Sequence, residues 1–142
     1  MIRLILVGLT AVSLTGCHEH LPDPPPQIFP VSGKVLRAGK PMDGAYVKLL
    51  SVAPAPGQER WVPSATTDAE GNFVLSTYNS GDGAPPGDYV ATVLWPEIFK
   101  DKFGDPMEGK DRLGGRYATP QRSPLKVTVE EGDNQLPPFE LK

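Results

Sequence analysis

Hydrophobic and polar residues alternate with a period of two through most of the chain after residue 29. Because successive side chains of a β-strand point to opposite faces of a sheet, each alternating set predicts one strand with one buried face. Two more short segments, Ser64–Thr67 and one around Leu136–Leu141, bring the number of predicted strands to seven. The alternating sets are Val31/Gly33/Val35, Ala45/Val47/Leu49, Phe73/Leu75/Thr77, Tyr89/Ala91/Val93/Trp95 and Leu125/Val127/Val129.

Turn-forming residues separate these segments, and no window after the first 16 residues shows the 3.6-residue period of a helix. The chain has 17 prolines and 15 glycines among 142 residues, and each proline inside a helix costs about 3 kcal/mol. Short strands joined by turns predict an all-β fold with two packed sheets, a β-sandwich. In the turn at residues 68–71 we expect Gly71 at positive φ and Asp68 accepting backbone amides. Phe73 and Tyr89 are expected to point into the core.

The first 16 residues have the composition of a signal peptide. Arg3 supplies a positive start, and Leu4–Leu14 is an uncharged stretch of eleven residues, which is too short for a membrane span of about 20 residues. Leu14-Thr15-Gly16-Cys17 resembles the bacterial lipobox. That resemblance implies cleavage before Cys17 and attachment of a diacylglyceryl group to its thiol through a thioether, with fatty acyl chains such as palmitate. An uncleaved anchor, or an ordinary secretory signal with a coincidental cysteine, is the alternative.

Cys17 is the only cysteine, so it cannot form a disulfide within the chain. We therefore predict a signal peptide at residues 1–16, a proline-rich tether at residues 17–28 that begins with lipidated Cys17, and a β-sandwich at residues 29–142. The tether favours polyproline II and could lift the domain roughly 30 Å from a membrane. His18 stands where an aspartate often signals retention in the inner membrane, which favours the outer membrane. His18 and His20 have no third fixed ligand, so we expect no metal site there.

Charge and missing motifs exclude several function classes. After removal of residues 1–16 the chain has 13 basic and 17 acidic residues, with no cluster of Lys or Arg in the sequence, so nucleic acid is not an expected partner. No histidine follows His20, which excludes Ser-His-Asp, Cys-His and histidine-metal catalysis in the domain. We expect no catalytic residue and no cofactor. An enzyme on the same scaffold remains an alternative, and would need ionisable groups to converge, for example around Asp111, Arg112, Arg116 and Tyr117.

Four sequence elements resemble the carboxypeptidase regulatory-like domain family. They are Val31-Ser32-Gly33-Lys34-Val35, Gly39-Lys40-Pro41-Met42-Asp43-Gly44-Ala45-Tyr46-Val47, Thr67-Asp68-Ala69-Glu70-Gly71-Asn72-Phe73 and Pro86-Gly87-Asp88-Tyr89-Val90-Ala91-Thr92-Val93. The resemblance covers about residues 30–95 and implies a transthyretin-like sandwich of about seven strands. The C-terminal part, with Gly115-Arg116-Tyr117 and Ser123-Pro124-Leu125, is similar to small lipoproteins of planctomycete-type bacteria. Neither resemblance implies a substrate, because a fold does not determine a function.

Two oxygen-rich segments keep a calcium-binding or small-ligand module open as an alternative. Asp68 to Asn72 and Asn79 to Gly83 offer carboxylate and carbonyl oxygens of the kind that Ca²⁺ prefers. Neither segment is followed by the bidentate glutamate of an EF-hand loop. Plain turns are the favoured interpretation of both.

The segment Pro96–Pro124 contains 29 residues without a clear strand pattern, longer than the roughly 12–15 residues beyond which structureless loops are uncommon. The favoured interpretation is a loop that folds over the open end of the sandwich and covers the core. The alternative is a protein- or glycan-binding surface, with Phe99 and Phe103 on one face if a short helix forms. The function expected is a noncatalytic, lipid-anchored module outside the cytoplasm that binds a protein or an envelope glycan or has a structural role. The candidate surface residues are Trp95, Phe99, Phe103, Arg112, Arg116 and Tyr117.

Overall fold

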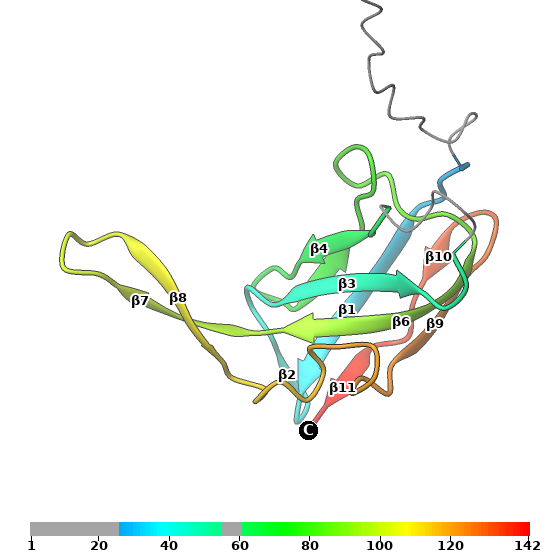
Figure 1. The fold of residues 1–142 in the computed structure, drawn as a ribbon. Coiled ribbons are helices and arrows are strands. Elements are labelled where there is room, and N and C mark those ends of the chain that lie inside the picture. Colours follow the sequence, from blue (N-terminus) through cyan, green and yellow to red (C-terminus); the bar gives the residue numbers. More distant parts are fainter. Residues whose placement is uncertain (1–25, 55–60) are drawn as a thin grey trace, which may run out of the picture.

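The computed structural model describes residues 26–54 and 61–142, and this part of the chain contains strands and turns but no helix (Figure 1). The predicted signal peptide, Cys17 and most of the tether lie outside the described residues. Eleven strands follow one another along the chain. They are β1 (Val31–Arg37), β2 (Lys40–Pro41), β3 (Tyr46–Ser51), β4 (Ser64–Thr66), β5 (Asn72–Val74), β6 (Gly87–Leu94), β7 (Pro96–Lys100), β8 (Pro106–Asp111), β9 (Lys126–Val129), β10 (Asn134–Gln135) and β11 (Phe139–Leu141).

The first sheet is built around β1. On one side β1 pairs antiparallel with β5 and β2, and on the other side it pairs parallel with β10 and β11. The parallel pairing is possible because the chain crosses the second sheet before it returns to β1 with its last strands. The centre of this sheet is therefore a single strand that runs the full length of the sandwich.

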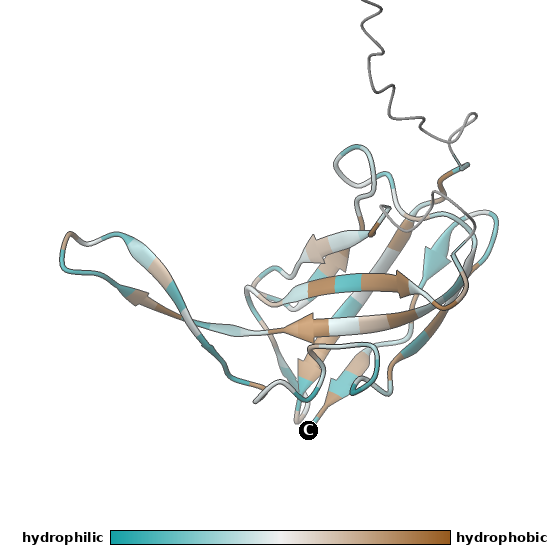
Figure 2. Ribbon diagram, viewed as in Figure 1, coloured by the Kyte–Doolittle hydropathy of each residue, from teal (hydrophilic) through white to brown (hydrophobic). Residues whose placement is uncertain are grey.

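The second sheet is antiparallel, with the strand order β4-β3-β6-β9. Its longest pairing joins β3 to β6 over six residue pairs, from Tyr46 opposite Leu94 to Ser51 opposite Tyr89. The two sheets face each other, with β3 and β6 lying across β1 in the view of Figure 1. Hydrophobic residues are concentrated on the strands of these two sheets (Figure 2). The all-β sandwich predicted from the sequence is therefore the observed architecture.

A single core cluster fills the space between the sheets. Phe73 and Tyr89 are buried in it, as predicted, and the Phe73 ring lies 5.8 Å from the ring of Phe139. Gly33 lies under Phe73, and a Cβ on Gly33 would overlap that ring. The cluster contains side chains of both sheets, among them Val31, Val35 and Leu141 from the first and Val47, Leu49, Ala91, Val93, Val127 and Val129 from the second.

The seven predicted strands all occur, as β1, β3, β4, β5, β6, β9 and β11. Two other strands, β2 and β10, have only two residues each. Gly71 has a φ of 77°, and the backbone amides of Glu70 and Asn72 donate to Oδ1 of Asp68, as predicted for that turn. In residues 26–54 and 61–142 there is no helix of the length and hydropathy needed to cross a membrane.

For the first part of the segment 96–124, residues 96–111, the expectation was wrong. Pro96–Lys100 and Pro106–Asp111 form a two-stranded antiparallel sheet, β7 and β8, where the sequence suggested an irregular loop or a short helix. These strands lack an alternation of apolar and polar residues because neither face is buried: nine of their eleven residues are exposed. The pattern that reveals a half-buried strand is therefore missing.

Candidate functional site

The hairpin formed by residues 96–111, here called the arm, extends away from the sandwich (Figure 1). It consists of β7, a tip turn and β8, and it belongs to neither of the two large sheets. A two-stranded hairpin is marginally stable by itself, and each strand of the arm pairs only with the other. The arm is thus an element whose shape is not explained by core formation.

Apolar side chains of the arm lie open to solvent. Phe103 is 77% exposed, Ile98 57%, Phe99 53% and Met107 47%. Phe99 lies directly opposite Met107 in the strand register, so these two side chains share one face of the ribbon, while Ile98 lies opposite Glu108 on the other. Four large apolar side chains on one thin exposed element are unusual for a surface that contacts only water.

The tip of the arm is a structured turn. Oδ1 of Asp101 accepts the backbone amides of Phe103 and Asp105, at 2.8 and 3.0 Å, and the Gly104 amide donates to the Asp101 carbonyl. Gly104 has a φ of 90°, which a residue with a side chain rarely adopts. The Lys102 ammonium lies 4.9 Å from the centre of the Phe103 ring. The turn therefore holds the Phe103 ring outward in a preorganised position.

Asp111 fixes the base of the arm. Its Oδ1 accepts the backbone amides of Trp95 and Leu113, and its Oδ2 accepts that of Gly115. The Arg112 amide donates to the Trp95 carbonyl at 2.8 Å, which closes the two ends of the arm on each other. One carboxylate thus connects the strand that leaves the sandwich with the chain that returns to it.

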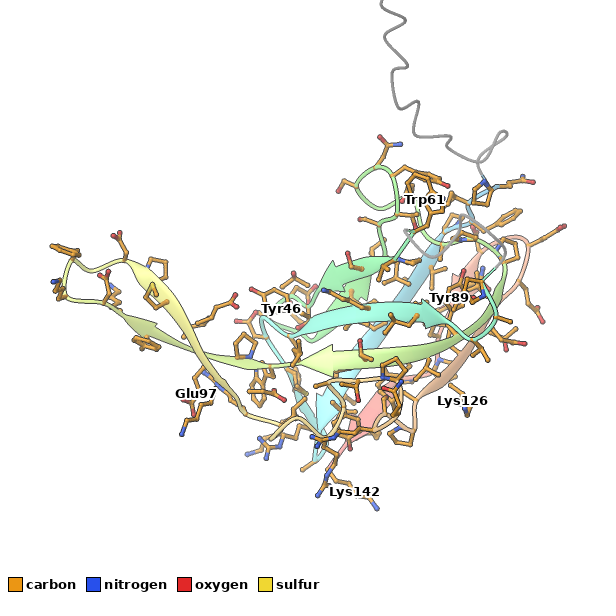
Figure 3. All side chains as sticks on the ribbon, viewed as in Figure 1. Tyr46, Trp61, Tyr89, Glu97, Lys126 and Lys142 are labelled. Carbon is orange, nitrogen blue, oxygen red and sulfur yellow. The ribbon has the colours of Figure 1, made fainter. Side chains whose placement is uncertain are left out.

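A second attachment joins β8 to the sandwich. The hydroxyl of Tyr46, at the start of β3 (Figure 3), donates a hydrogen bond to a carboxylate oxygen of Glu108. This hydrogen bond is the main cause that raises the pKa of Tyr46 above its usual value. The arm is therefore oriented from its base and also from its side.

Two of the predicted surface residues, Arg112 and Arg116, lie at the end of the sandwich where β1 finishes. The Arg112 guanidinium carbon lies 4.7 Å from the centre of the Trp95 ring, and that of Arg37, the last residue of β1, lies 5.9 Å from it. The Trp95 ring is half-buried and its Nε1 donates to the Asp43 carbonyl. Two guanidinium groups thus lie over the half-buried Trp95 ring.

Tyr117 was placed on the predicted surface, and this was wrong. Its side chain is 5% exposed and belongs to the core, and its hydroxyl accepts the backbone amide of Lys142. Leu113 is buried in the same core, so the segment from Arg112 to Ser123 does cover the core, as the favoured interpretation proposed. The sequence analysis treated residues 96–124 as one segment, although Gly114 and Gly115 mark a turn between the arm and Tyr117.

The six predicted surface residues therefore fall into separate groups. Phe99 and Phe103 lie on the arm, Arg112 and Arg116 lie exposed at the end of the sandwich, and Trp95 and Tyr117 lie beneath. Sequence analysis did not single out Ile98 and Met107, which complete the apolar surface of the arm. The grouping of Ile98 with Phe99 is visible in the sequence, whereas Met107 needs the hairpin register to be placed.

The two oxygen-rich segments are turns whose carboxylates bind backbone amides. Oδ1 of Asp82 accepts the Thr77 amide, and Oδ2 accepts the amides of Tyr78 and Asn79. Burial acts to raise the pKa of Asp82, but the amide donors together lower the pKa below its usual value. Among the described residues, no three His, Cys, Asp or Glu side chains are grouped so that they could hold a metal ion.

Shallow hollows on the sandwich do not bring the predicted ionisable groups together. One, of about 570 Å³, lies beside the arm and is lined in part by Tyr46, Lys48 and Glu108. Another, of about 270 Å³, lies near Asp88 and Tyr89, and the Tyr89 hydroxyl there donates to the Pro85 carbonyl. Asp111, Arg112, Arg116 and Tyr117 do not converge, because Asp111 binds backbone amides and Tyr117 is in the core.

Comparisons with known proteins identify no family. No protein-family model and no curated protein matches the sequence, so the resemblance to the carboxypeptidase regulatory-like domain stays a prediction. A Pseudomonas aeruginosa protein proposed to bind carbohydrate has a similar structure, with 17% identity, a TM-score of 0.45 and coverage of 85% of this chain and 99% of that one.

Two larger proteins also contain a region of similar structure. The major pilin subunit of Bacillus cereus is 15% identical, with a TM-score of 0.45 over 81% of this chain and 30% of the pilin. A 9R-lipoxygenase from Cyanothece is 12% identical, with a TM-score of 0.43 over 94% of this chain and 18% of the enzyme. This chain therefore spans less than a third of either protein. At such identities a likeness of shape gives no information about ligand or activity.

Proposed function

We propose that this protein is a noncatalytic binding module, held at a bacterial membrane by lipidated Cys17, that recognises a partner protein through its arm. The observation that supports the proposal is the group of exposed apolar side chains on the arm, with Phe103 at its tip. An arm of this kind adds nothing to the core, and water solvates its apolar side chains at a cost of about 25 cal/mol per Å². Burial of this surface in a complex would recover that free energy.

A protein fits the arm better than a glycan. The strands β7 and β8 each leave one edge unpaired, and backbone amides and carbonyls on such an edge can pair with a strand of another chain. Ile98, Phe99, Phe103 and Met107 have no hydrogen-bonding head group, whereas sugar hydroxyls need polar partners beside the stacking ring. Apolar anchors beside an open strand edge are typical of protein recognition.

Preorganisation supports the same function. The Asp101 turn, the Asp111 turn and the Tyr46–Glu108 hydrogen bond hold the arm before any partner arrives. A fixed arm loses less conformational entropy on binding than a disordered loop of the same length. The hollows on the sandwich offer no comparably prepared set of reactive groups, which is why we propose binding and not catalysis.

The test compares capture by the wild-type chain with capture by the double variant Phe99→Ser/Phe103→Ser. The full chain is immobilised and exposed to detergent-solubilised membranes, and bound proteins are quantified by mass spectrometry. We expect a defined partner to be depleted at least about tenfold by the variant, because loss of two hot-spot aromatics costs 2 kcal/mol or more.

The matched control is Val52→Ser/Val74→Ser, which removes two apolar side chains that are 60% and 54% exposed on the sandwich. This variant should retain the partner. Equal capture by both variants, or equal loss in both, would show that the arm is not the recognition element.

A further inference from the structure

The end of the sandwich at which β1 finishes concentrates positive charge, and we call it the basic end (Figure 1). Six exposed cationic residues belong to the segments that meet there, which are the ends of β1 and β11, β2 and the chain after β8: Arg37, Lys40, Arg112, Arg116, Arg122 and Lys142. The chain has 14 Lys and Arg residues in all and a net charge of −3, so the fold gathers at one end charges that are scattered in the sequence. The expectation of no basic cluster holds for the sequence but not for the surface.

Strand pairing and contacts with the Trp95 ring bring four of these residues together, Arg37, Lys40, Arg112 and Lys142. Lys40 lies opposite Arg37 in the β1–β2 pairing, and Lys142 follows Leu141, which pairs with Arg37 from the other side. Arg112 shares the Trp95 ring with Arg37, and Nη1 of Arg122 donates to the Gly115 carbonyl. Lys142 marks this end in Figure 3.

Acidic side chains do not cancel this charge. The carboxylates near this end are those of Asp43, Asp111 and Glu140, together with Glu97 at the start of the arm (Figure 3), which makes four against six cations. Asp111 already accepts three backbone amides through both of its oxygens. The basic end therefore keeps an excess of cationic groups in a chain whose overall charge is negative.

Two of the arginines, Arg37 and Arg112, lie close together over one aromatic ring. The Arg37 and Arg112 guanidinium groups both lie within about 6 Å of the Trp95 ring centre, close enough for cation–π attraction, and their N–H groups can still donate paired hydrogen bonds. Paired donors of this kind match the two oxygens of a carboxylate. A ligand with repeated carboxylates could engage both arginines and the surrounding cations at once.

The opposite end of the sandwich is acidic, and the chain enters there. The Asn134 amide donates to the Pro30 carbonyl at 2.9 Å, which places the start of β1 beside the turn that carries Glu130, Glu131 and Asp133. The seven residues of β1 separate the two ends by about 20 Å, at about 3.3 Å per residue. The described chain therefore begins at the acidic end, and the basic end is the farther of the two from residue 26.

We infer that the basic end binds an acidic polysaccharide through its carboxylate groups. An anionic lipid surface fits less well because the described chain begins at the acidic end, so a preceding anchor would join the body there. Nucleic acid fits less well because Tyr117 is buried and the half-buried Trp95 ring already has two guanidinium groups over it, whereas bases bind to open aromatic rings. The choice of a polysaccharide as the ligand rests on the proposed location at the cell envelope. The excess of cations at the basic end does not depend on that location.

Binding of polygalacturonate to the full chain in detergent, at physiological salt, tests the inference. Lys40→Gln/Arg116→Gln should weaken binding about tenfold, and Arg37→Gln/Arg112→Gln at least as much. The first variant leaves the Trp95 contacts intact, so it separates charge from packing. Lys48→Gln/Lys126→Gln removes two exposed cations of the second sheet and should leave the affinity unchanged. Added salt should weaken the wild-type complex.

Three outcomes would overturn the inference. One is unchanged affinity in both basic-end variants, and another is an equal loss in the Lys48/Lys126 control. The third is equal or tighter binding of neutral dextran, single-stranded DNA or vesicles containing phosphatidylglycerol. None of these measurements uses a variant of the arm. A negative result for polysaccharide binding is therefore distinguishable from a negative result for protein binding through the arm.

Discussion

At the scale of single residues, carboxylates hold the turns of this protein. Asp68, Asp82, Asp101 and Asp111 each accept two or three backbone amides, and each does so in the turn that ends or begins a strand. An aspartate that binds its own backbone in this way is a known turn former, which is why the turn at Asp68 could be predicted from sequence. The same hydrogen bonds to backbone amides account for the aspartates in the two oxygen-rich segments without a bound cation.

Asp82→Asn should lower the free energy of unfolding by about 2 kcal/mol at pH 7, because three amides lose a charged acceptor. The pKa of Asp82 is lower in the folded chain than in the unfolded one, so its stabilisation is present above the unfolded pKa of about 3.9 and is lost as the pH falls through the folded value. The difference between variant and wild type should therefore shrink toward pH 3.

Urea denaturation at pH 7 and pH 3 measures this difference. Asp133→Asn, an exposed aspartate in the turn before β10, serves as the control and should change stability little at either pH. A loss at Asp82 that is the same at both pH values would contradict the role given to its charge.

At the scale of elements, sequence periodicity identified the strands that bury one face and missed those that bury none. The strands β1 and β3 bury one set of alternating side chains, which is visible in the sequence from Val31 to Val35 and from Val47 to Leu49, whereas β6 is buried on both faces from Tyr89 to Val93. The arm has no such set, and prolines at its strand starts further hide it, although Pro is tolerated in edge strands. The basic end was also hidden, because its cations come together only through strand pairing.

Tyr46→Phe tests whether the arm is held from its side. The variant loses the hydrogen bond from the Tyr46 hydroxyl to Glu108, and a single exposed hydrogen bond contributes about 1 kcal/mol or less. Hydrogen–deuterium exchange should become several-fold faster in residues 97–100 and 107–111 and stay unchanged in β3 and β6. Tyr78→Phe, at a tyrosine 36% exposed on the sandwich, is the control. No change in the arm would mean that its base alone orients it.

At the scale of the whole molecule, three features are arranged along one body. The described chain begins beside an acidic end, the basic end lies opposite, and the arm extends sideways from the basic end through Trp95 and Arg112. If a lipid anchor precedes this body, the arm and the basic end are both presented to what lies beyond the membrane. This arrangement connects the proposed anchor with both proposed binding surfaces.

Cys17→Ser should abolish the anchor without disturbing the sandwich, because Cys17 precedes the described residues. The variant has no thiol to carry the acyl chains that hold a lipoprotein at a membrane. In fractionated cells we therefore expect it to leave the membrane fraction or to accumulate as an unprocessed precursor. Mass spectrometry of the mature wild-type protein should show an acylated cysteine at its N-terminus. Unchanged fractionation of the variant would contradict lipid anchoring.

Photo-crosslinking in intact cells tests the role of the arm most directly. A photoreactive residue at Phe103 should give one defined protein adduct, and the same residue at Thr128, exposed on β9, should not. Excess purified wild-type chain added to permeabilised cells should suppress the adduct, whereas Phe99→Ser/Phe103→Ser should not. No adduct at Phe103, or the same adducts at both positions, would contradict recognition through the arm.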